Sequence, residues 1–355
     1  MTVSDSGVSY RDAGVDIDAK MRVVDKMKTM LNGAQGASAG PIGHFGGTYL
    51  VPSGPDQILV ASADGIGTKL KLAFTLGGEA YAGVGRDIVH HCDNDILALG
   101  AKPLFFLDYF ATGKLDSEVA LSVIGGIADA CEGTGLALIG GETAEMPEMY
   151  RDGEYDLAGF IVGTVAPDKK VDGSSVEIGD VILGLPSNGL HTNGYSLARK
   201  IVGLTDDIEH DRELLATPLP GGKGATLGEG LLATHLSYRK SIQPALDAEL
   251  IHGMAHITGG GLHDNVPRFL PDDCIARFDI TAWKIPPIFD YLVERGEVSI
   301  DERYRVFNIG LGFVAVVKRA EKDVALALIP GAREVGEIIE RMTSDESPVQ
   351  GLSCD

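Results

Sequence analysis

Short apolar runs alternate with amphipathic stretches along most of this chain. Four runs in the first half have the length of buried strands: ILVASA (58–63), PLFFLDYFA (103–111), LALIGG (136–141) and DLAGFIVGTVA (156–166). The second half adds VILGLPS (181–187), GFVAVV (312–317) and a closing strand near Val335. Apolar residues three and four positions apart predict helices over 16–31, 83–99, 117–132, 194–202, 226–236 and from Glu321 onward. This alternation predicts a mixed α/β fold.

A polar, turn-rich stretch near residues 166–180 divides the pattern into two halves. We therefore predict an N-terminal domain over 1–170 and a C-terminal α/β domain over 171–345. A variable tail over 346–355 carries no motif. The length of 355 residues is enough for two domains, each with its own core.

Composition narrows the class of protein. Acidic residues outnumber basic ones by 51 to 30, and the net charge of −21 argues against a nucleic-acid partner or an anionic-membrane surface. No apolar run reaches about 18 residues and no secretory signal is visible, so we expect neither a membrane span nor export. The four cysteines lie far apart without a C-x-x-C pair, which is typical of reduced thiols in a cytoplasmic protein.

Common nucleotide and hydrolase motifs are absent or out of context. The sequence has no G-x-x-x-x-G-K-[ST] loop, no complete G-x-G-x-x-G after a strand, no H-E-x-x-H and no EF-hand loop. Residues 36–40 match G-x-S-x-G, but a nucleophile elbow needs a strand before it and a helix after it. Here a predicted helix precedes the motif and Pro41 follows it, so a flexible glycine-rich flap is the better interpretation.

Three carboxylates are associated with the apolar runs of the first half. We expect Asp64, Asp108 and Glu142 to lie where strands stop, at the edge where α/β proteins open onto ligand crevices. Mg²⁺ takes hard oxygen ligands from carboxylates, water and phosphate, so their convergence would suit a magnesium–nucleotide site. Taken singly, each carboxylate could equally be a helix cap or a solvated turn residue.

The predicted helix 83–99 adds a further polar group. Asp87, His91 and Asn94 or Asp95 are spaced three and four residues apart, which places them on one helix face. We expect this face to join the strand-end carboxylates. His90 and His256 carry no such signal and could be structural histidines.

Glycine-rich turns supply candidate anion sites. The segment DGIGTK (64–69) places two glycines, a hydroxyl and an ammonium directly after a strand, where backbone N–H groups and Lys69 could bind phosphate. The segments SNGLHTNGYS (187–196) and HITGGGLHDN (256–265) have the same character, although turn chemistry explains their glycines equally well. The loop 33–47 is also glycine-rich, and we expect it to be a mobile lid over the nucleotide.

Eight segments between about residues 10 and 317 carry a resemblance to a known enzyme family: YRDAGVDIDA, ADGIGTKLKLA, NDILALGAKPLFFLDYFATGKLD, GGETAEMPEMY, DLAGFIVG, HTNGYSLAR, HGMAHITGGGLHDNVPR and YRVFNIGLGFVAVV. In content and order they resemble the aminoimidazole ribonucleotide synthetases, the phosphoribosylformylglycinamidine cyclo-ligases of purine biosynthesis. The resemblance implies the two-domain α/β fold that these enzymes share with selenophosphate synthetase, thiamine-monophosphate kinase and the purine amidotransferase. It also implies a homodimer joined through strands of the N-terminal domain.

The reaction implied by this resemblance consumes ATP with Mg²⁺. The formyl oxygen of formylglycinamidine ribonucleotide is phosphorylated, the amidine nitrogen attacks the same carbon, and phosphate leaves. Ring closure gives 5-aminoimidazole ribonucleotide, ADP and phosphate. The N-terminal domain would bind ATP and magnesium, and the C-terminal domain would complete the cleft.

The resemblance also implies roles for individual residues. Asp64, Asp95 and Glu142 are the expected metal ligands, and Lys69, His191 and Asp108 are the expected catalytic residues. The ATP-binding residues would be Asp64, Gly65, Gly67, Thr68, Lys69, Asp95, Gly141, Glu142 and Thr143. The substrate-binding residues would be Asn188, Gly189, His191, Asn193, Gly259, Gly260, Gly261 and Asn265.

Two other interpretations stay open at this point. The chain could be another phosphoryl-transfer enzyme of the superfamily, similar to thiamine-monophosphate kinase or selenophosphate synthetase. However, the first cysteine is Cys92, and glutamate stands at 142 where the kinase usually has aspartate. A non-catalytic scaffold of the same fold is the third possibility, and the intact set of carboxylates argues against it.

Overall fold

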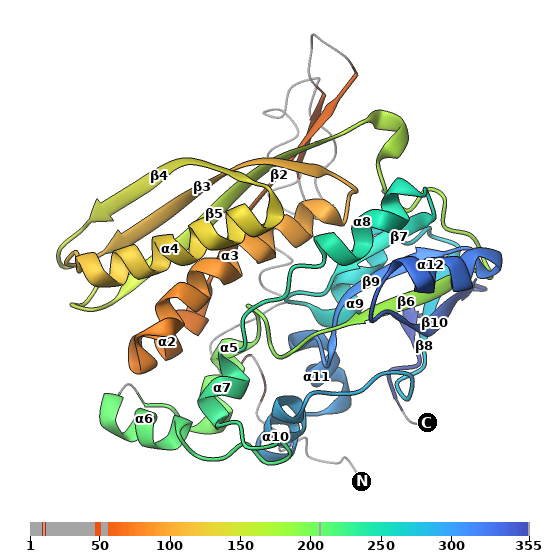
Figure 1. Cartoon of the computed structure of the whole chain (residues 1–355). Helices are drawn as coiled ribbons and strands as arrows, with labels where there is room; N and C mark the ends of the chain where they lie inside the picture. Colours follow the sequence, from red (N-terminus) through yellow and green to blue (C-terminus); the bar gives the residue numbers. More distant parts are fainter. Residues whose placement is uncertain (1–8, 10, 12–46, 51–55, 206, 354–355) are drawn as a thin grey trace.

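The computed structural model describes residues 9, 11, 47–50, 56–205 and 207–353. Two sheets with their helices account for nearly all of this part of the chain (Figure 1). The N-terminal sheet has the order β1-β2-β5-β3-β4, with β1 Gly47–Leu50, β2 Ile58–Gly65, β3 Lys102–Thr112, β4 Ala137–Glu145 and β5 Tyr155–Val165. Its helices are α2 Leu70–Leu76, α3 Glu79–Leu97 and α4 Ser117–Thr134. The predicted mixed α/β fold is confirmed.

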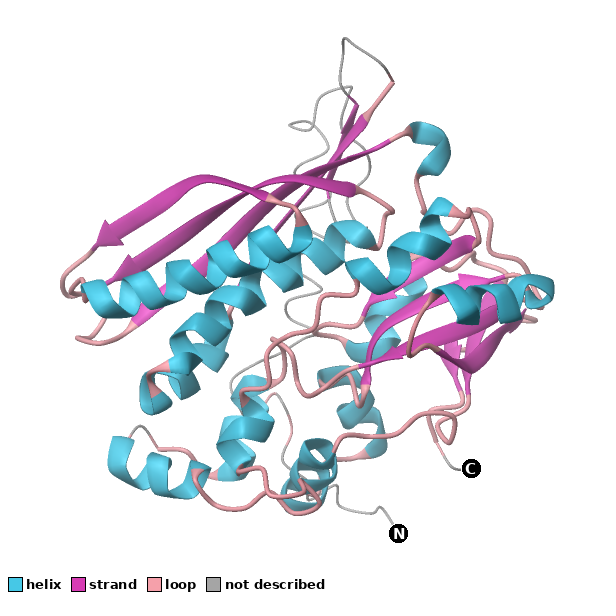
Figure 2. Ribbon diagram, viewed as in Figure 1, coloured by secondary structure: helices cyan, strands magenta, loops and turns pink. Residues whose placement is uncertain are grey.

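Only one face of the N-terminal sheet is covered by described helices. Helices α3 and α4 lie on the same side of the sheet (Figure 2), and buried residues alternate along β5 as a half-covered strand requires. The opposite face exposes large apolar side chains: Leu104 is 41% exposed, Ile139 59% and Phe160 44%. This sheet therefore presents an open apolar surface, which we call the open face.

The two helices under the sheet pack at unusually short range. A Cβ at Gly85 on α3 would lie 2.1 Å from the Val123 carbonyl oxygen, and one at Gly126 on α4 would lie 2.0 Å from the Ala82 carbonyl oxygen. Neither glycine can be replaced without moving a helix backbone. The close approach lets Val123 and its neighbours fill the core beneath β3 and β5.

The C-terminal sheet is covered on both faces. Its order is β11-β8-β10-β6-β9-β7, with β6 Val181–Pro186, β7 Ile251–His256, β8 Cys274–Phe278, β9 Leu311–Val317, β10 Arg333–Glu340 and β11 Val349–Gln350. The helices of this half are α5 Tyr195–Val202, α6 Ile208–Leu215, α7 Leu227–Leu231, α8 Arg239–Asp247, α9 Gly261–Asn265, α10 Pro287–Gly296, α11 Ile300–Val306 and α12 Lys322–Leu328. Two apolar cores result, one on each face, and every residue of β9 is buried.

The structure of the residues near the C-terminus differs from what we expected. We expected residues 346–355 to be a variable tail separate from the C-terminal domain. Instead Val349 and Gln350 form β11, which pairs in parallel with β8, and Val349 and Leu352 are buried in the larger core. An apolar residue at every third position is too short a pattern to predict such a strand from sequence.

Adjacent glycines on α4 should respond to alanine in opposite directions. A Cβ at Gly125 meets nothing within 4 Å, so Gly125→Ala should stabilise the protein by about 0.5–1 kcal/mol through helix propensity. Gly126→Ala should destabilise it by about 1–3 kcal/mol, because the new methyl group overlaps the α3 backbone. Urea unfolding of both variants measures the difference, and equal shifts would contradict the helix contact.

Candidate functional site

Helix α3 directs a row of buried polar side chains at the C-terminal domain. The single Nε–H of Arg239 on α8 is shared between the two carboxylate oxygens of Asp93, at 2.8 and 2.9 Å. Asp87 accepts from the His235 backbone amide at 2.7 Å, and Asn94 accepts from another amide of the same segment. These α3 side chains are almost completely buried, so each requires a partner to offset its desolvation. The contacts fix α3 against the C-terminal domain.

Asp64, His91 and Asp95 meet at the edge of this interface. One ligand atom from each lies within 4.8 Å of the others. His91 Nε2 is 2.7 Å from Asp64 Oδ2, and Asp95 Oδ2 accepts a hydrogen bond from Ser62 at 2.9 Å. The Asp64 side chain is 44% exposed whereas the other two members are buried. The predicted convergence of Asp64 with the polar face of α3 is thus present, and its two carboxylates are suitable oxygen ligands for a divalent cation.

A chain of hydrogen bonds continues from this group into the C-terminal domain. His91 Nδ1 is 2.9 Å from Thr192 Oγ1, which is 2.7 Å from His235 Nδ1. His235 Nε2 is 3.1 Å from His256 Nε2, and His256 Nδ1 is 2.8 Å from Asp95 Oδ1. The chain thus begins at one carboxylate and returns to the other. We call it the histidine chain.

The charges along the histidine chain differ from ring to ring. Burial works against protonation of His91, but the nearby charges of Asp64, Asp95 and Asp87 outweigh it and raise its pKa to about 9. Burial lowers the pKa of His235 and of His256, and the carboxylate beside His256 only partly opposes this. The positive charge in the group therefore resides on the ring next to Asp64.

Lys69 occupies a different position from the one expected. Its ammonium is completely buried, 2.6 Å from Asp87 Oδ2, and it donates to the His191 carbonyl at 2.8 Å. Burial lowers the pKa of Lys69, whereas Asp87 raises it. The Lys69 ammonium therefore links Asp87 of α3 to the C-terminal domain. It does not face solvent beside Gly65 and Gly67. Asp64 and Thr68 of this motif are exposed, and the Thr68 hydroxyl is 2.9 Å from that of Ser196.

His191 has unusual geometry for a buried residue. Its backbone has a positive φ of 63°, and its ring stacks on His235 with 4.1 Å between ring centroids. Neither ring nitrogen of His191 has a hydrogen-bond partner among the described residues. Burial lowers its pKa well below the ordinary value. A strained residue with unused buried donors and acceptors suits a ligand-binding role.

The other predicted substrate residues lie in two turns of the C-terminal domain. A Cβ on Gly259 would lie 3.4 Å from the Asn193 side-chain nitrogen, so the structure brings the turns together. Asn188 is exposed and donates to a backbone carbonyl at 2.9 Å. Asn265 is buried and donates to the Gly261 carbonyl at 2.8 Å, so it stabilises its own turn. Of the remaining glycines, Gly189 accepts a hydrogen bond from Asn308 and Gly260 precedes α9.

Asp108 and Glu142 do not lie where the sequence suggested. Both are inside strands, because β3 continues to residue 112 and β4 passes through the glycine pair to residue 145. Asp64 is level with Gly159, Asp108 and Gly141 on the successive strands β5, β3 and β4. This places Asp108 on the α3 side, two strands from Asp64, where burial raises its pKa.

Glu142 is farther from Asp64 than Asp108 is, and it lies on the other face of the sheet. It follows Gly141 in β4 and is level with Tyr109, so it lies on the open face, as alternation along a strand requires. Asp64 and Gly141 are also three strand spacings apart, roughly 14 Å at about 4.8 Å each. Within one chain Glu142 cannot share a metal ion with Asp64 and Asp95. Gly141 and Thr143 lie in the same distant strand.

Sequence reasoning missed the partners that the C-terminal domain supplies. Arg239, His235 and Thr192 complete the interface, although no motif singled them out as site residues. They contact residues of α3 more than 100 positions away, so no local spacing could have indicated them. Helix α3 gave one indication that such partners exist. It carries many charged residues together with apolar ones, and charged side chains that are buried need partners.

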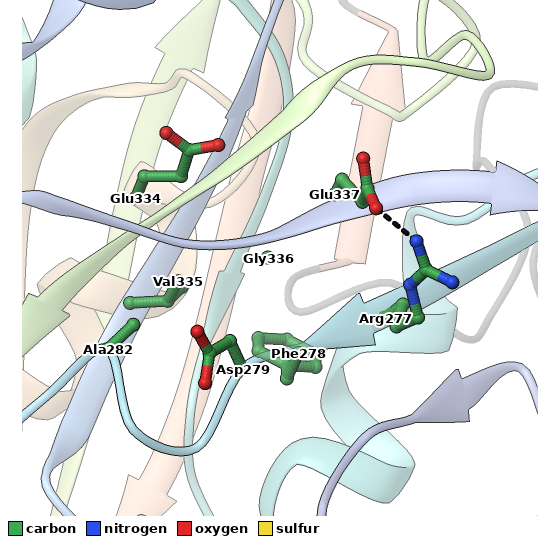
Figure 3. A pocket seen from close by; sticks show the side chains of 8 residues that line it. All are labelled: Arg277, Phe278, Asp279, Ala282, Glu334, Val335, Gly336 and Glu337. Atoms are coloured by element: carbon green, nitrogen blue, oxygen red, sulfur yellow. Dashed lines mark hydrogen bonds and ion pairs between the residues drawn. The ribbon is translucent and has the colours of Figure 1, made fainter.

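A cavity on the C-terminal sheet lies away from this site. It has a volume of about 460 Å³ and lies against β8 and β10, with Arg277 pointing toward Glu337 (Figure 3). Two of the acidic side chains there have cationic partners, since Glu337 pairs with Arg277 and Glu334 with Lys322, and Asp279 accepts hydrogen bonds from Thr281. None of the residues predicted for the site lines this cavity.

Two expectations concern other parts of the chain. The predicted lid over 33–47 lies outside the described residues except for Gly47, which begins β1. Among the described helices, none is both long enough and apolar enough to span a bilayer.

Comparison with known proteins places this architecture in a class. Residues 47–165 match the N-terminal domain of AIR synthase related proteins, and residues 177–346 match the C-terminal domain. The fold is similar to that of AaThiL complexed with AMPPCP and TMP, at a TM-score of 0.58 and 15% identity over 96% of this chain and 93% of that one. It is also similar to hydrogenase maturation protein HypE in complex with ATP, at a TM-score of 0.57 and 18% identity over 93% and 90%. The chain therefore has the two-domain AIR synthase fold.

Within that class, several relatives are much more similar in sequence than these structures are. The phosphoribosylformylglycinamidine cyclo-ligase of Paraburkholderia phymatum is 49% identical over 338 residues, which cover 93% of this chain and 91% of the relative. The chain belongs to the phosphoribosylformylglycinamidine cyclo-ligase family. It is accordingly an enzyme of the carbon–nitrogen ligase type, as the resemblance implied.

The burial of Lys69 generates a prediction about folding. Lys69→Met should reduce the free energy of unfolding by about 3–5 kcal/mol, because Asp87 is left as an uncompensated buried charge. Adding Asp87→Asn should recover most of the loss, since asparagine can still accept from the His235 amide. Denaturant unfolding of the single and double variants measures both effects. A Lys69→Met protein of normal stability would show that the ammonium is not paired in solution.

Proposed function

We propose that this protein converts formylglycinamidine ribonucleotide to 5-aminoimidazole ribonucleotide, with ATP consumed to ADP and phosphate. The observation that supports this most strongly is the 49% identity with a cyclo-ligase over nearly the whole chain. An amide oxygen is a poor leaving group, and phosphorylation makes it a good one, so the reaction needs a site that orients ATP and neutralises its phosphates. The kinase-like alternative is not favoured, because its likeness is confined to the fold.

Asp64 and Asp95 are the proposed ligands of Mg²⁺. The donor set fits, because both are carboxylates, their oxygen atoms lie close together, and Asp64 is open to solvent. When bound, the ion would reduce the negative charge of the ATP phosphates. The chain's own part is to hold the two carboxylates with His91 and Ser62 as hydrogen-bond donors. Glu142 of the same chain is left out of this proposed set, because it lies on the other face of the sheet.

The substrate is proposed to contact the turns that carry Asn188, His191 and Asn193. His191 offers two ring nitrogens without partners among the described residues, and its lowered pKa makes the ring neutral. A neutral imidazole can accept a proton or donate a hydrogen bond as the ring closes. His191 is therefore preferred to Lys69 as a catalytic residue, since the lysine ammonium is already paired. Asp108 is a buried acid on the α3 side of the sheet, and we propose no specific catalytic step for it.

A homodimer formed through the N-terminal sheet is proposed on the evidence of the open face. Leu104, Ile139 and Phe160 are too large and too exposed to be usual on a solvated strand surface. A second copy would cover this face in a self-complementary way. We also propose a cytoplasmic location, since the three described cysteines are unpaired.

The proposed reaction is tested by assay of the purified protein. With formylglycinamidine ribonucleotide, ATP and Mg²⁺, we expect 5-aminoimidazole ribonucleotide and ADP in equal amounts. Asp64→Asn should lower kcat/KM by about a hundredfold or more, because a ligand for the phosphate-bound cation is lost. Its melting temperature, measured without metal, should fall only modestly.

Asp129→Asn is the matched control for this variant. Asp129 is an exposed acid on α4 with a single long ion pair at 3.6 Å. Its replacement removes the same charge and should leave turnover at the wild-type level. Full activity of Asp64→Asn would remove Asp64 from the metal site, and the absence of product with the wild-type protein would refute the proposed reaction.

The dimer is tested by placing a charge on the open face. Phe160→Glu should convert the dimer to a monomer of about 37 kDa in sedimentation equilibrium at micromolar concentration, because burying an unpaired carboxylate is costly. Leu121→Glu introduces the same charge at a 73% exposed leucine on α4, on the helix side, and should leave the dimer intact. A wild-type protein that sediments only as a monomer would contradict the proposal.

A further inference from the structure

The histidine chain joins the two proposed metal carboxylates. Asp64 is contacted by His91 and Asp95 by His256, and both rings are buried. A carboxylate can only accept, so each ring must present an N–H to its acid. The remaining nitrogens of the two rings connect through Thr192 and His235.

Thr192 stands at the centre of this connection. Its hydroxyl lies between two Nδ1 atoms, 2.9 Å from that of His91 and 2.7 Å from that of His235, and it is buried. A hydroxyl has one hydrogen, so it donates to one ring and accepts from the other. The hydrogen bonds of His91 and His235 to this hydroxyl are therefore linked, because an unmatched pair of buried polar groups is unfavourable.

The same constraint passes from His235 to His256. Their Nε2 atoms are 3.1 Å apart, and the Asn94 side-chain nitrogen is 3.2 Å from His235 Nε2, so the hydrogen positions on the two rings are coupled. Each of the six ring nitrogens of His91, His235 and His256 has a hydrogen-bond partner in the chain. The three rings are therefore engaged with one another and with the carboxylates, although their spacing alone could hold a metal ion.

We propose that Thr192 is a positioning residue whose hydroxyl sets the direction of the hydrogen bonds to His91 and His235 and, through His235, the proton position of His256, so that His91 and His256 hold Asp64 and Asp95 in the orientation that binds Mg–ATP. This inference rests on the proposed function for the identity of the ligand. Its physical basis is that Thr192 belongs to the C-terminal domain whereas Asp64 and Asp95 belong to the N-terminal domain. The closed interface therefore determines the geometry of the carboxylates.

The test compares three variants of the full-length protein. Thr192→Val keeps the shape and removes the hydroxyl, and Thr192→Ser restores the hydroxyl. Thr112→Val is the control, because Thr112 is equally buried and its hydroxyl also makes two hydrogen bonds, but at the far end of β3. Nitrogen-15 NMR of the imidazoles in metal-free protein reads the tautomers. Steady-state kinetics with varied Mg–ATP reads kcat and KM separately.

Thr192→Val should change the imidazole nitrogen signals of both His91 and His256 and should raise KM for Mg–ATP at least tenfold. Thr192→Ser should restore the wild-type imidazole signals and return KM for Mg–ATP to within about threefold of the wild-type value. Thr112→Val should affect stability alone. Unchanged signals in Thr192→Val, an equal kinetic loss in Thr112→Val, failure of serine to rescue, or zinc bound to the purified protein would each overturn the inference. An inactive wild-type protein would refute the proposed function instead, and the NMR comparison would still decide the role of Thr192.

Discussion

The structure depends on neutralising the polar side chains that α3 buries between the domains. Asp87, Asp93 and Asn94 have almost no solvent contact, and the partners of all three include groups in the C-terminal domain or the Lys69 ammonium beside it. Losing one partner of a buried pair costs about 3–5 kcal/mol, against a total stability of about 5–15 kcal/mol for a typical protein. Separation of the domains would expose several such groups at once, so α3 keeps the domains together.

The same helix explains how the site is assembled. Its apolar residues pack beneath β2, β3 and β5, which places one turn of its polar face beside Asp64 at the end of β2. The C-terminal domain then supplies the hydroxyl and imidazole groups that surround His91. The two carboxylates thus have hydrogen-bond partners in both domains, with Ser62 and His91 in one and His256 in the other.

Local periodicity predicted the parts of this arrangement that lie within one element. The spacing of Asp87, His91 and Asp95 indicated a shared helix face, and the structure confirms that these residues point toward one interface. The strand pattern near Asp64 was equally informative. For Glu142 the prediction was wrong, because a glycine pair was interpreted as the end of a strand that continues through it. Side chains alternate along a strand, so Glu142 lies on the face opposite to that of Gly141, which is level with Asp64.

Contacts between distant segments could not be predicted in the same way. Arg239 and His235 pair with α3 across more than 140 positions, and their sequence neighbours are ordinary for the start of a helix. Lys69 shows the same limit, since a lysine after a glycine turn suggests phosphate binding until a buried aspartate is found beside it. The terminal strand β11 is defined only by its pairing with β8.

The directional nature of the interface has a consequence for how these enzymes can diverge. An apolar contact tolerates many exchanges of similar volume, whereas the Asp93–Arg239 pair and the His91–Thr192–His235 chain require a donor opposite each acceptor. Consider a chimera that joins the N-terminal half of this enzyme to the C-terminal half of a relative. It would fold stably only if the relative supplied a matching donor or acceptor for each of these hydrogen bonds. The two halves are therefore expected to evolve as one unit, although each has a hydrophobic core of its own.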